Sequence, residues 1–176
     1  LGRLQEAAAE FREVLRIDPN NIHAHLLIGK LYVPSPMGLF TPPAYPKEFD
    51  RLPEAAVEFR EILRLQPNNV EALVNLGLLE LEFGRLQEAA VKFREALRLD
   101  HNELRAHYSL GTIYAKFGYW QKAIDEFGVF RKGDTEAHFF GGHRFNSATM
   151  HFNLAKAYLA TGLWGKAFSE YKTAIS

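Results

Sequence analysis

The sequence predicts an all-α fold built from stacked pairs of antiparallel helices, and three observations carry that prediction. A 17-residue segment occurs in three closely similar copies, at residues 2–18, 50–66 and 84–100. Its apolar residues are spaced three and four apart, which gathers them in one stripe along a helix. The turn residues Asp50, Gly84 and Gly118 follow one another at intervals of 34 residues. A period of this length is typical of an α-solenoid.

We expect about nine helices, namely one second helix at the start and then four helix pairs. The predicted order along a single solenoid of residues 1–176 is a partial repeat 1–21, repeats 22–69, 70–103 and 104–137, and a partial repeat 148–176. The chain starts at a turn and ends inside a second helix, so we expect a piece of a longer protein. A solenoid end exposes an apolar face unless a polar helix caps it, and we expect both ends to be uncapped.

Two irregular insertions interrupt the period. The first, at about 33–49, adds 14 residues within a repeat, and its five prolines exclude a helix throughout. The second, at about 134–147, adds 10 residues between repeats and is rich in glycine. These two kinds of loop lie at opposite ends of a helix pair, so we expect the insertions at opposite edges. Before the second insertion, Gly128, Phe130 and Arg131 break the pattern, which predicts a second helix that ends early or packs differently.

Both insertions are rich in aromatic residues. These are Phe40, Tyr45 and Phe49 in the first insertion and Phe139, Phe140 and Phe145 in the second. The rings either cover their own repeats or form contacts with a partner, since long loops on a rigid scaffold often carry binding residues. The string Pro42-Pro43-Ala44-Tyr45 also fits the short PPxY ligand of WW domains, which is a weak match of four residues.

Several positions recur together, and at these residues the chain resembles the tetratricopeptide repeat family. The turn residue is Gly2, Asp50, Gly84, Gly118 and Gly162. The small residue that opens the second helix is Ala7, Ala55, Ala89, Ala123 and Ala167, and the aromatic residue one turn later is Phe11, Phe59, Phe93, Phe127 and Tyr171. In the first helices a Leu-Gly-like pair stands at 28–29, 76–77, 110–111 and 154–155. A tyrosine follows it at Tyr32, Tyr114 and Tyr158, whereas Glu80 stands there in the repeat 70–103.

The resemblance implies a right-handed solenoid whose first helices line a concave groove for extended or helical peptides. The residues expected to line this groove are Lys30, Asn75, Leu78, Arg105, Tyr108, Thr112, Lys116, Phe152, Asn153 and Lys156. Asn75 and Asn153 stand where the family often uses an amide to hold a peptide backbone. The cations are suited to acidic side chains or a terminal carboxylate. The alternative for Leu78 and its neighbours is packing between adjacent repeats.

The carboxylate clamp that the family uses for chaperone tails is not reproduced. That clamp needs a Lys and an Asn one turn apart in its first repeat, and this chain has Leu26 and Lys30 at those positions. We therefore do not expect a receptor for chaperone tails.

The remaining composition argues against other classes of function. The 21 basic and 21 acidic side chains balance, which disfavours nucleic-acid binding. No apolar run is long enough for direct insertion into a membrane. No catalytic motif is present, and neither a cofactor nor a metal site is expected. His25, His107 and His151 each occupy the bulky position of a first helix, so we interpret them as core-filling residues rather than metal ligands.

The sequence therefore predicts a non-catalytic scaffold or adaptor that binds a protein or peptide partner through the groove or the aromatic insertions. The alternative is a structural protein that assembles head to tail, as a homo-oligomer or filament, through uncapped ends. An enzyme is a remote third possibility. The identity of the partner and the compartment do not follow from the sequence.

Overall fold

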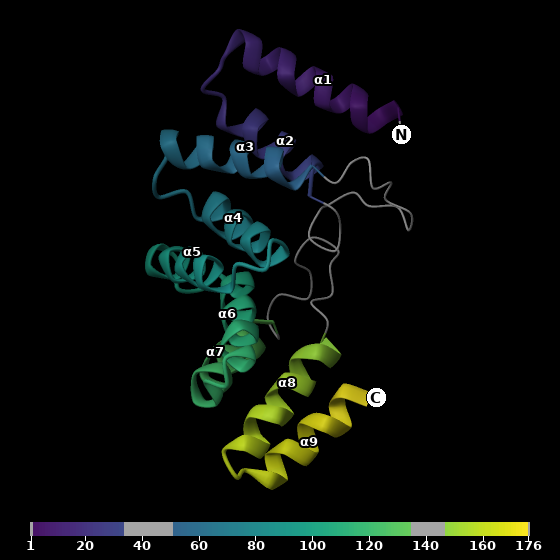
Figure 1. The fold of residues 1–176 in the computed structure, drawn as a ribbon, viewed down its shortest axis with the longest axis vertical. Coiled ribbons are helices and arrows are strands. Elements are labelled where there is room, and N and C mark those ends of the chain that lie inside the picture. Colours follow the sequence, from purple (N-terminus) through teal and green to yellow (C-terminus); the bar gives the residue numbers. More distant parts are fainter. Residues whose placement is uncertain (1, 34–50, 135–146, 176) are drawn as a thin grey trace. The chain divides into compact units, whose positions relative to one another are not determined.

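The computed structural model describes residues 2–33, 51–134 and 147–175, and in these ranges every regular element is an α-helix. The helices are α1 (Gly2–Ile17), α2 (Ile22–Leu31), α3 (Leu52–Leu65), α4 (Val70–Glu82), α5 (Leu86–Leu99), α6 (Leu104–Lys116), α7 (Trp120–Asp134), α8 (Ser147–Ala160) and α9 (Trp164–Ile175) (Figure 1). The predicted all-α fold class is confirmed. The division into repeats stays a prediction, and both aromatic clusters of the insertions lie outside the described residues.

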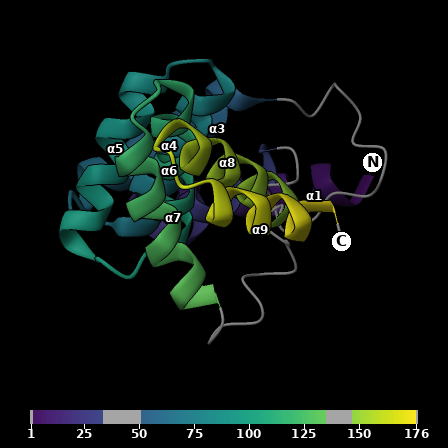
Figure 2. The same cartoon turned by 90° about the horizontal axis from the view of Figure 1, so that it is seen from below.

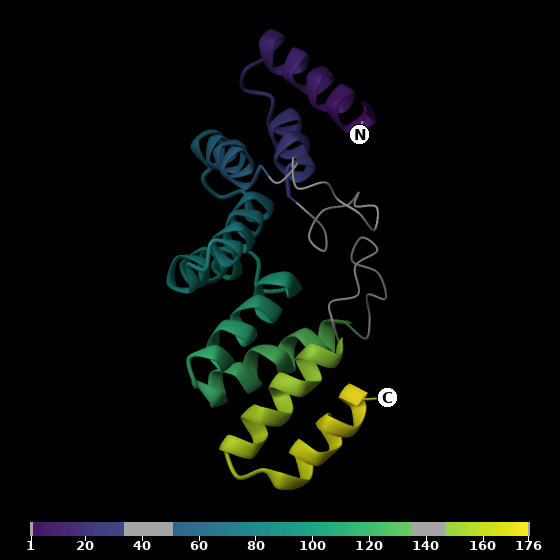
Figure 3. The ribbon, with the colours of Figure 1, turned by 45° about the vertical axis from the view of Figure 1, so that its right-hand side comes forward.

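Two compact units make up the chain, Leu1–Lys92 and Phe93–Ser176. In unit 1, α2 packs against both α1 and α3, and α3 also packs against α4 (Figure 3). The core of this unit gathers around Phe59 of α3, which is fully buried with Ile28 of α2 and Leu76 of α4. At Gly29 of α2 a β-carbon would lie only 2.7 Å from Cε1 of Phe59. The predicted combination of a glycine on one helix and a phenylalanine on the other thus sets the close approach of α2 and α3.

Unit 2 repeats this arrangement. Helices α6 and α7 form one pair and α8 and α9 form the next, with α8 also packed against α7 and α6 (Figure 2). Phe127 of α7 is fully buried, and a β-carbon at Gly111 of α6 would lie 2.7 Å from its Cε1 atom. Met150 and Leu154 of α8 complete the core on the other side of α7.

The three described turns within helix pairs share one backbone geometry. Gly84, Gly118 and Gly162 have φ angles of 74°, 74° and 77°, a region that side chains other than hydrogen disfavour. At Gly84 its N–H donates to the Leu81 carbonyl (2.9 Å), and the N–H of Arg85 donates to the Glu80 carbonyl (2.8 Å). This is a Schellman motif, which satisfies the last carbonyls of a helix and reverses the chain. The recurring glycine is therefore a requirement of the turn.

The tyrosine that follows the Leu-Gly pair lies against a cation of the following second helix or its preceding turn. Arg51 lies 4.7 Å from the Tyr32 ring centroid, and Lys122 and Lys166 lie 5.6 Å from the rings of Tyr114 and Tyr158. Glu80 replaces this tyrosine on α4, and its carboxylate pairs with Arg85 (3.1 Å) and Arg60 (3.6 Å). The departure from the motif at Glu80 therefore keeps a cation as the partner, because a carboxylate and an aromatic face both attract positive charge.

The expectation of an early end for the second helix at 120–134 is wrong. Helix α7 runs on to Asp134, past the pattern-breaking residues. Phe130 explains the different packing, because its side chain is 2% exposed and lies against the ring of Tyr108 on α6 (centroids 5.3 Å apart). An extra aromatic contact between the two helices thus accompanies the departure from the repeat pattern.

Candidate binding surface on the first helices

One predicted groove residue of unit 1, Lys30, is already engaged within the unit. Lys30, near the end of α2, forms an ion pair with Glu71 at the start of α4. Both helices start at similar caps, because the Asn21 and Asn69 side chains accept hydrogen bonds from the N–H groups of Ala24 (3.0 Å) and Ala72 (2.9 Å). A ligand carboxylate would have to compete with Glu71 for the Lys30 ammonium.

Asn75 on α4 is 9% exposed, and its Nδ2 atom has no hydrogen-bond partner within the part of the chain that the structure describes. Leu78, one turn further along, is half-buried. A buried amide donor without an acceptor costs about 1–3 kcal/mol. Asn75 therefore combines polarity with burial at a position where the sequence analysis expects a backbone-binding amide.

The predicted residues on α6 also have partners within unit 2. Arg105 donates from Nε and Nη2 to the two carboxylate oxygens of Glu103 (2.9 Å each), and Thr112 Oγ1 donates to the Tyr108 carbonyl (3.0 Å). The Tyr108 ring packs edge-on against Phe127, and burial raises the pKa of its hydroxyl. Only Lys116, in the last turn of α6, extends into solvent as an exposed cation.

The predicted residues on α8 form the most open part of the surface. Phe152 is 48% exposed and lies edge-to-face on Tyr171 of α9, with ring centroids 5.7 Å apart. The Lys156 ammonium lies 5.8 Å from the Phe152 ring centroid. Asn153, the residue after Phe152, is half-buried. Helix α8 thus presents an aromatic ring, an amide and a cation within a little more than one turn.

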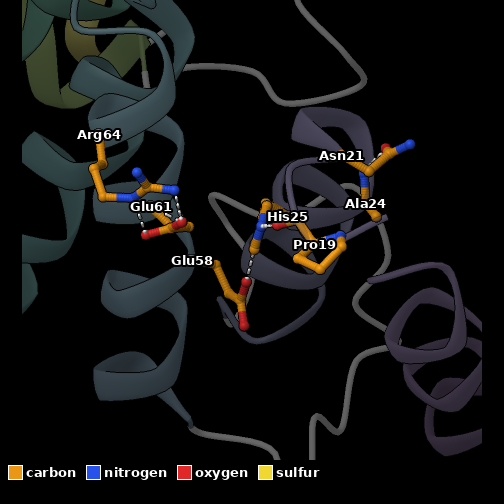
Figure 4. Close-up of polar contacts among 7 residues, drawn as sticks. All are labelled: Pro19, Asn21, Ala24, His25, Glu58, Glu61 and Arg64. Atoms are coloured by element: carbon orange, nitrogen blue, oxygen red, sulfur yellow. Dashed lines mark hydrogen bonds and ion pairs between the residues drawn. The ribbon is translucent and has the colours of Figure 1, made fainter. Parts of the chain in front are cut away.

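Three histidines connect the first helices to the second helices, a role that the sequence analysis missed. The Nδ1 atoms of His25, His107 and His151 each lie 2.6 Å from a glutamate oxygen, that of Glu58, Glu126 and Glu170 respectively. Figure 4 shows the first of these contacts, with the His25 ring between Glu58 and Pro19. The hydrogen bond to Glu126 raises the pKa of His107; burial opposes this, while the His101 carbonyl and the charges of Glu126 and Glu103 add to it.

A signal for these contacts was present in the sequence. Wherever the first helix carries the histidine, the matching position of the second helix carries a glutamate, whereas the pair 70–103 has Leu73 and Lys92 instead. The interpretation of the histidines as core residues was right about their burial for His25 and His107, which are 8% and 9% exposed. It overlooked their hydrogen-bonding capacity.

Two further features bear on function. The described residues contain no group of three or more His, Cys, Asp or Glu side chains placed to hold a metal ion. Over residues 2–33, 51–134 and 147–175, none of the helices has the length and apolar character needed to cross a membrane.

Comparisons with known proteins agree with this fold. Tetratricopeptide repeat models match residues 48–103 and 1–21. A crystal structure of MamA superposes with a TM-score of 0.71 at 22% identity, covering 99% of this chain and 88% of that one. MamA from Desulfovibrio magneticus RS-1, residues 41 to the end, gives a TM-score of 0.72 at 17% identity, covering 99% and 85%. YrrB, described as a tetratricopeptide repeat protein with an unusual peptide-binding site, gives 0.69 at 20%, covering 99% and 77%. A search of the curated proteins found no match.

The chain is thus an all-α helical-repeat protein of the solenoid class. It carries tetratricopeptide repeats, which the family models match over residues 48–103 and 1–21. Tetratricopeptide repeat proteins are in general non-catalytic scaffolds, and the fold described above supports a protein-interaction scaffold in general.

Proposed function

We propose that this chain binds an extended segment of a protein partner on the first-helix face of unit 2, with α8 as the main contact. The observation that carries this proposal is the exposed ring of Phe152. Its edge-to-face contact with Tyr171 and the nearby Lys156 ammonium hold the ring in place, while Phe152 as a residue stays 48% exposed. A preorganised aromatic surface of this kind is typical of binding residues, because little side-chain entropy is lost when a ligand covers it.

The neighbouring side chains indicate the chemistry of the ligand. The Asn153 amide is able both to donate to and accept from a peptide group. Lys156 provides a cation beside the ring, and exposed Lys116 adds another on α6, which contacts α8. The best-fitting ligand is therefore an extended peptide with an apolar side chain next to a carboxylate.

Two further points support the proposal, the first for its place on unit 2 and the second for peptide binding by this fold. The cation at the equivalent face of unit 1, Lys30, already pairs with Glu71. The structural neighbour YrrB is described as having a peptide-binding site, so this fold is able to present a peptide-binding surface.

The test is a selection of random peptides on the immobilised chain, followed by affinity measurements on the variants. We expect the double substitution Phe152→Ala with Lys156→Ala to weaken a selected peptide at least about tenfold, which is 1.4 kcal/mol. The matched control, Phe168→Ala with Lys172→Ala, changes an aromatic residue and a lysine on α9. An unchanged affinity in the first variant, or an equal loss in the control, would overturn the proposal.

A second candidate function, head-to-tail assembly, is favoured by the outer face of α9. Trp164, Phe168 and Ile175 are 69%, 75% and 85% exposed. The equivalent positions on α3 are Leu52, Ala56 and Leu63, which belong to the hydrophobic core of unit 1 or pack against it. The face of α9 therefore has the composition of a packing surface, and a second copy of the chain would cover it.

Light scattering across a concentration series tests this second function. Assembly through α9 is supported if the mass of the unmodified chain rises with concentration and the Phe168→Ser variant stays monomeric. A constant monomer mass for the unmodified chain contradicts it.

A further inference from the structure

Two of the buried histidines have a hydrogen-bond acceptor at both ring nitrogens. In His107, Nδ1 lies 2.6 Å from Glu126 Oε2 and Nε2 lies 3.0 Å from the carbonyl oxygen of His101. His25 has the same environment, with Glu58 Oε2 at 2.6 Å and the Pro19 carbonyl oxygen at 3.0 Å. Each contact thus involves the first helix, the following second helix and the turn that precedes the pair.

The chemistry of these partners determines how many protons the group holds. A carbonyl oxygen only accepts, so Nε2 must carry a hydrogen. A neutral imidazole has a single N–H, and its Nδ1 lone pair would then face a carboxylate lone pair at hydrogen-bond distance. One additional proton must therefore lie between Nδ1 and the glutamate, on whichever of the two atoms it resides.

We propose that His107, with Glu126 and the His101 carbonyl, is a proton-dependent clasp that fastens the first helix α6 to its second helix α7. His25, with Glu58 and the Pro19 carbonyl, has the same geometry between α2 and α3. The His107 clasp is closed while it holds the additional proton and opens when a rise in pH removes it. A closed clasp contributes a charge-assisted hydrogen bond in a half-buried position, which is stronger than a neutral one.

The charges around His107 favour retention of the proton. Around His107 the charged neighbours are Glu126 of α7 and Glu103 at the start of α6, and both are acidic. Near His25, Glu58 and Glu61 lie on α3, and Glu61 is paired with Arg64 (2.7 Å) (Figure 4). A carboxylate near an imidazolium stabilises the charged form, which is consistent with the raised pKa of His107.

The two remaining helix pairs provide internal comparisons. Glu170, which contacts His151, also accepts a hydrogen bond from Arg131 Nη1 (3.0 Å). A permanent cation thus shares that carboxylate, and the proposal does not include the His151–Glu170 contact. In the pair 70–103, Leu73 and Lys92 occupy the two positions and no clasp is formed by those residue types.

The His107 clasp is separate from the proposed binding function, but it lies next to the proposed binding surface on the first helices of unit 2. His107 directly precedes Tyr108, and Tyr108 packs on Phe127 and Phe130 of α7. An open clasp removes the polar contact between α6 and α7 and leaves their apolar contacts in place. The clasp is therefore expected to adjust the order of the first helix without unfolding the pair.

The experiment is a pH titration of the histidine rings by NMR in the full chain, with exposed His23 and His101 as internal references. We expect His107 to keep both ring nitrogens protonated at a pH at which His23 and His101 are neutral. Glu126→Gln keeps an acceptor but removes its charge, and we expect it to lower the His107 midpoint by about one pH unit or more. A His107 midpoint at or below those of the references, or one that Glu126→Gln leaves unchanged, would overturn the proposal.

A gain of function provides a second test. The double substitution Leu73→His with Lys92→Glu installs the clasp residues in the pair that lacks them. We expect the new histidine to titrate above His23 in the double variant and to lose that elevation in Leu73→His alone. Equal midpoints in the single and double variants would contradict the proposal.

Discussion

The two helix pairs of unit 2 follow one plan but present different surfaces. In the α6/α7 pair, Gly111 lets the fully buried Phe127 reach the backbone of α6, and Tyr108 packs down onto the same ring. In the α8/α9 pair, Ala155 and Tyr171 stand at the equivalent positions, and Tyr171 is only half-buried. Above it, Phe152 stays half-exposed instead of packing into the pair as Tyr108 does.

This difference separates positions that maintain the fold of every repeat from positions that give one repeat its own surface. Both pairs share the positive-φ glycine turn and a histidine–glutamate contact. They differ at the glycine–phenylalanine contact and at the residue after the histidine, Tyr108 or Phe152. The closed pair α6/α7 is therefore expected to contribute stability, and the open pair α8/α9 to contribute binding.

The largest effect is expected from truncating the aromatic residue of each second helix. Phe127→Ala removes a fully buried ring and should cost about 3–5 kcal/mol of unfolding free energy. Tyr171→Ala at the equivalent position should cost less than half as much, because its ring is already partly hydrated. Chemical denaturation of both variants checks this, and equal losses would contradict the distinction between a closed and an open pair.

A smaller effect is expected when α6 receives the residue that α8 carries at the same place. Gly111→Ala sets a β-carbon 2.7 Å from the Phe127 ring, so we expect a loss of about 1–3 kcal/mol from overpacking. Gly128→Ala in α7 is the matched control, because no described atom beyond its chain neighbours and the adjacent backbone of its own helix lies within 4 Å of the added β-carbon. That control should gain about 0.5–1 kcal/mol from helix propensity. Thermal melting shows whether Gly111→Ala lowers stability while Gly128→Ala raises it. A loss of stability in both variants would contradict the expected gain in helix propensity at Gly128.

The pH dependence of stability should distinguish the pair with an unshared glutamate. The pKa of His107 is raised in the folded chain, so its contribution is fully present below the unfolded pKa and is lost as pH rises through the folded pKa. Amide hydrogen exchange in α6 should therefore accelerate toward alkaline pH, beyond the intrinsic rate, by an amount equivalent to about 1 kcal/mol. In Glu126→Gln this excess should vanish. An excess of the same size in that variant would assign it to another group.

Only a small effect on stability is expected at the proposed binding residues. Phe152→Ala with Lys156→Ala removes exposed side chains and one edge-to-face contact, so the unfolding free energy should change by less than about 1.5 kcal/mol. Urea denaturation measures this. A larger loss would mean that Phe152 holds α8 and α9 together, and a binding defect in this variant would then reflect folding.

The repetitive part of the fold was predictable because the same sequence signals recur in successive repeats. The turn glycines, the small residue on one helix and the phenylalanine on the other follow from local chemistry, and the recurrence of Gly29 with Phe59 and of Gly111 with Phe127 confirms it. The continuation of α7 to Asp134 was not predictable from the pattern, because the buried Phe130 stabilises it through a tertiary contact with Tyr108.

The individual side chains of the surface were harder to predict for a physical reason. Spacing along a helix identifies the face on which Lys30 and Arg105 lie, but their partners Glu71 and Glu103 depend on side-chain rotamers and on neighbouring elements. The histidine contacts required a comparison of two helices at once, since neither His107 nor Glu126 is unusual by itself. Whether Asn75, Asn153 and the other predicted groove residues contact a peptide stays a prediction.

The most direct test of the central claim is NMR mapping of a peptide selected on the intact chain. The claim is that the open first-helix face of unit 2 is the binding surface. It predicts that titration with the peptide shifts the amide signals of Phe152, Asn153 and Lys156, with smaller shifts at Lys116. Shifts concentrated on Trp164, Phe168 and Ile175 of α9, with α8 unaffected, would contradict the claim and assign binding to the outer face of the last helix.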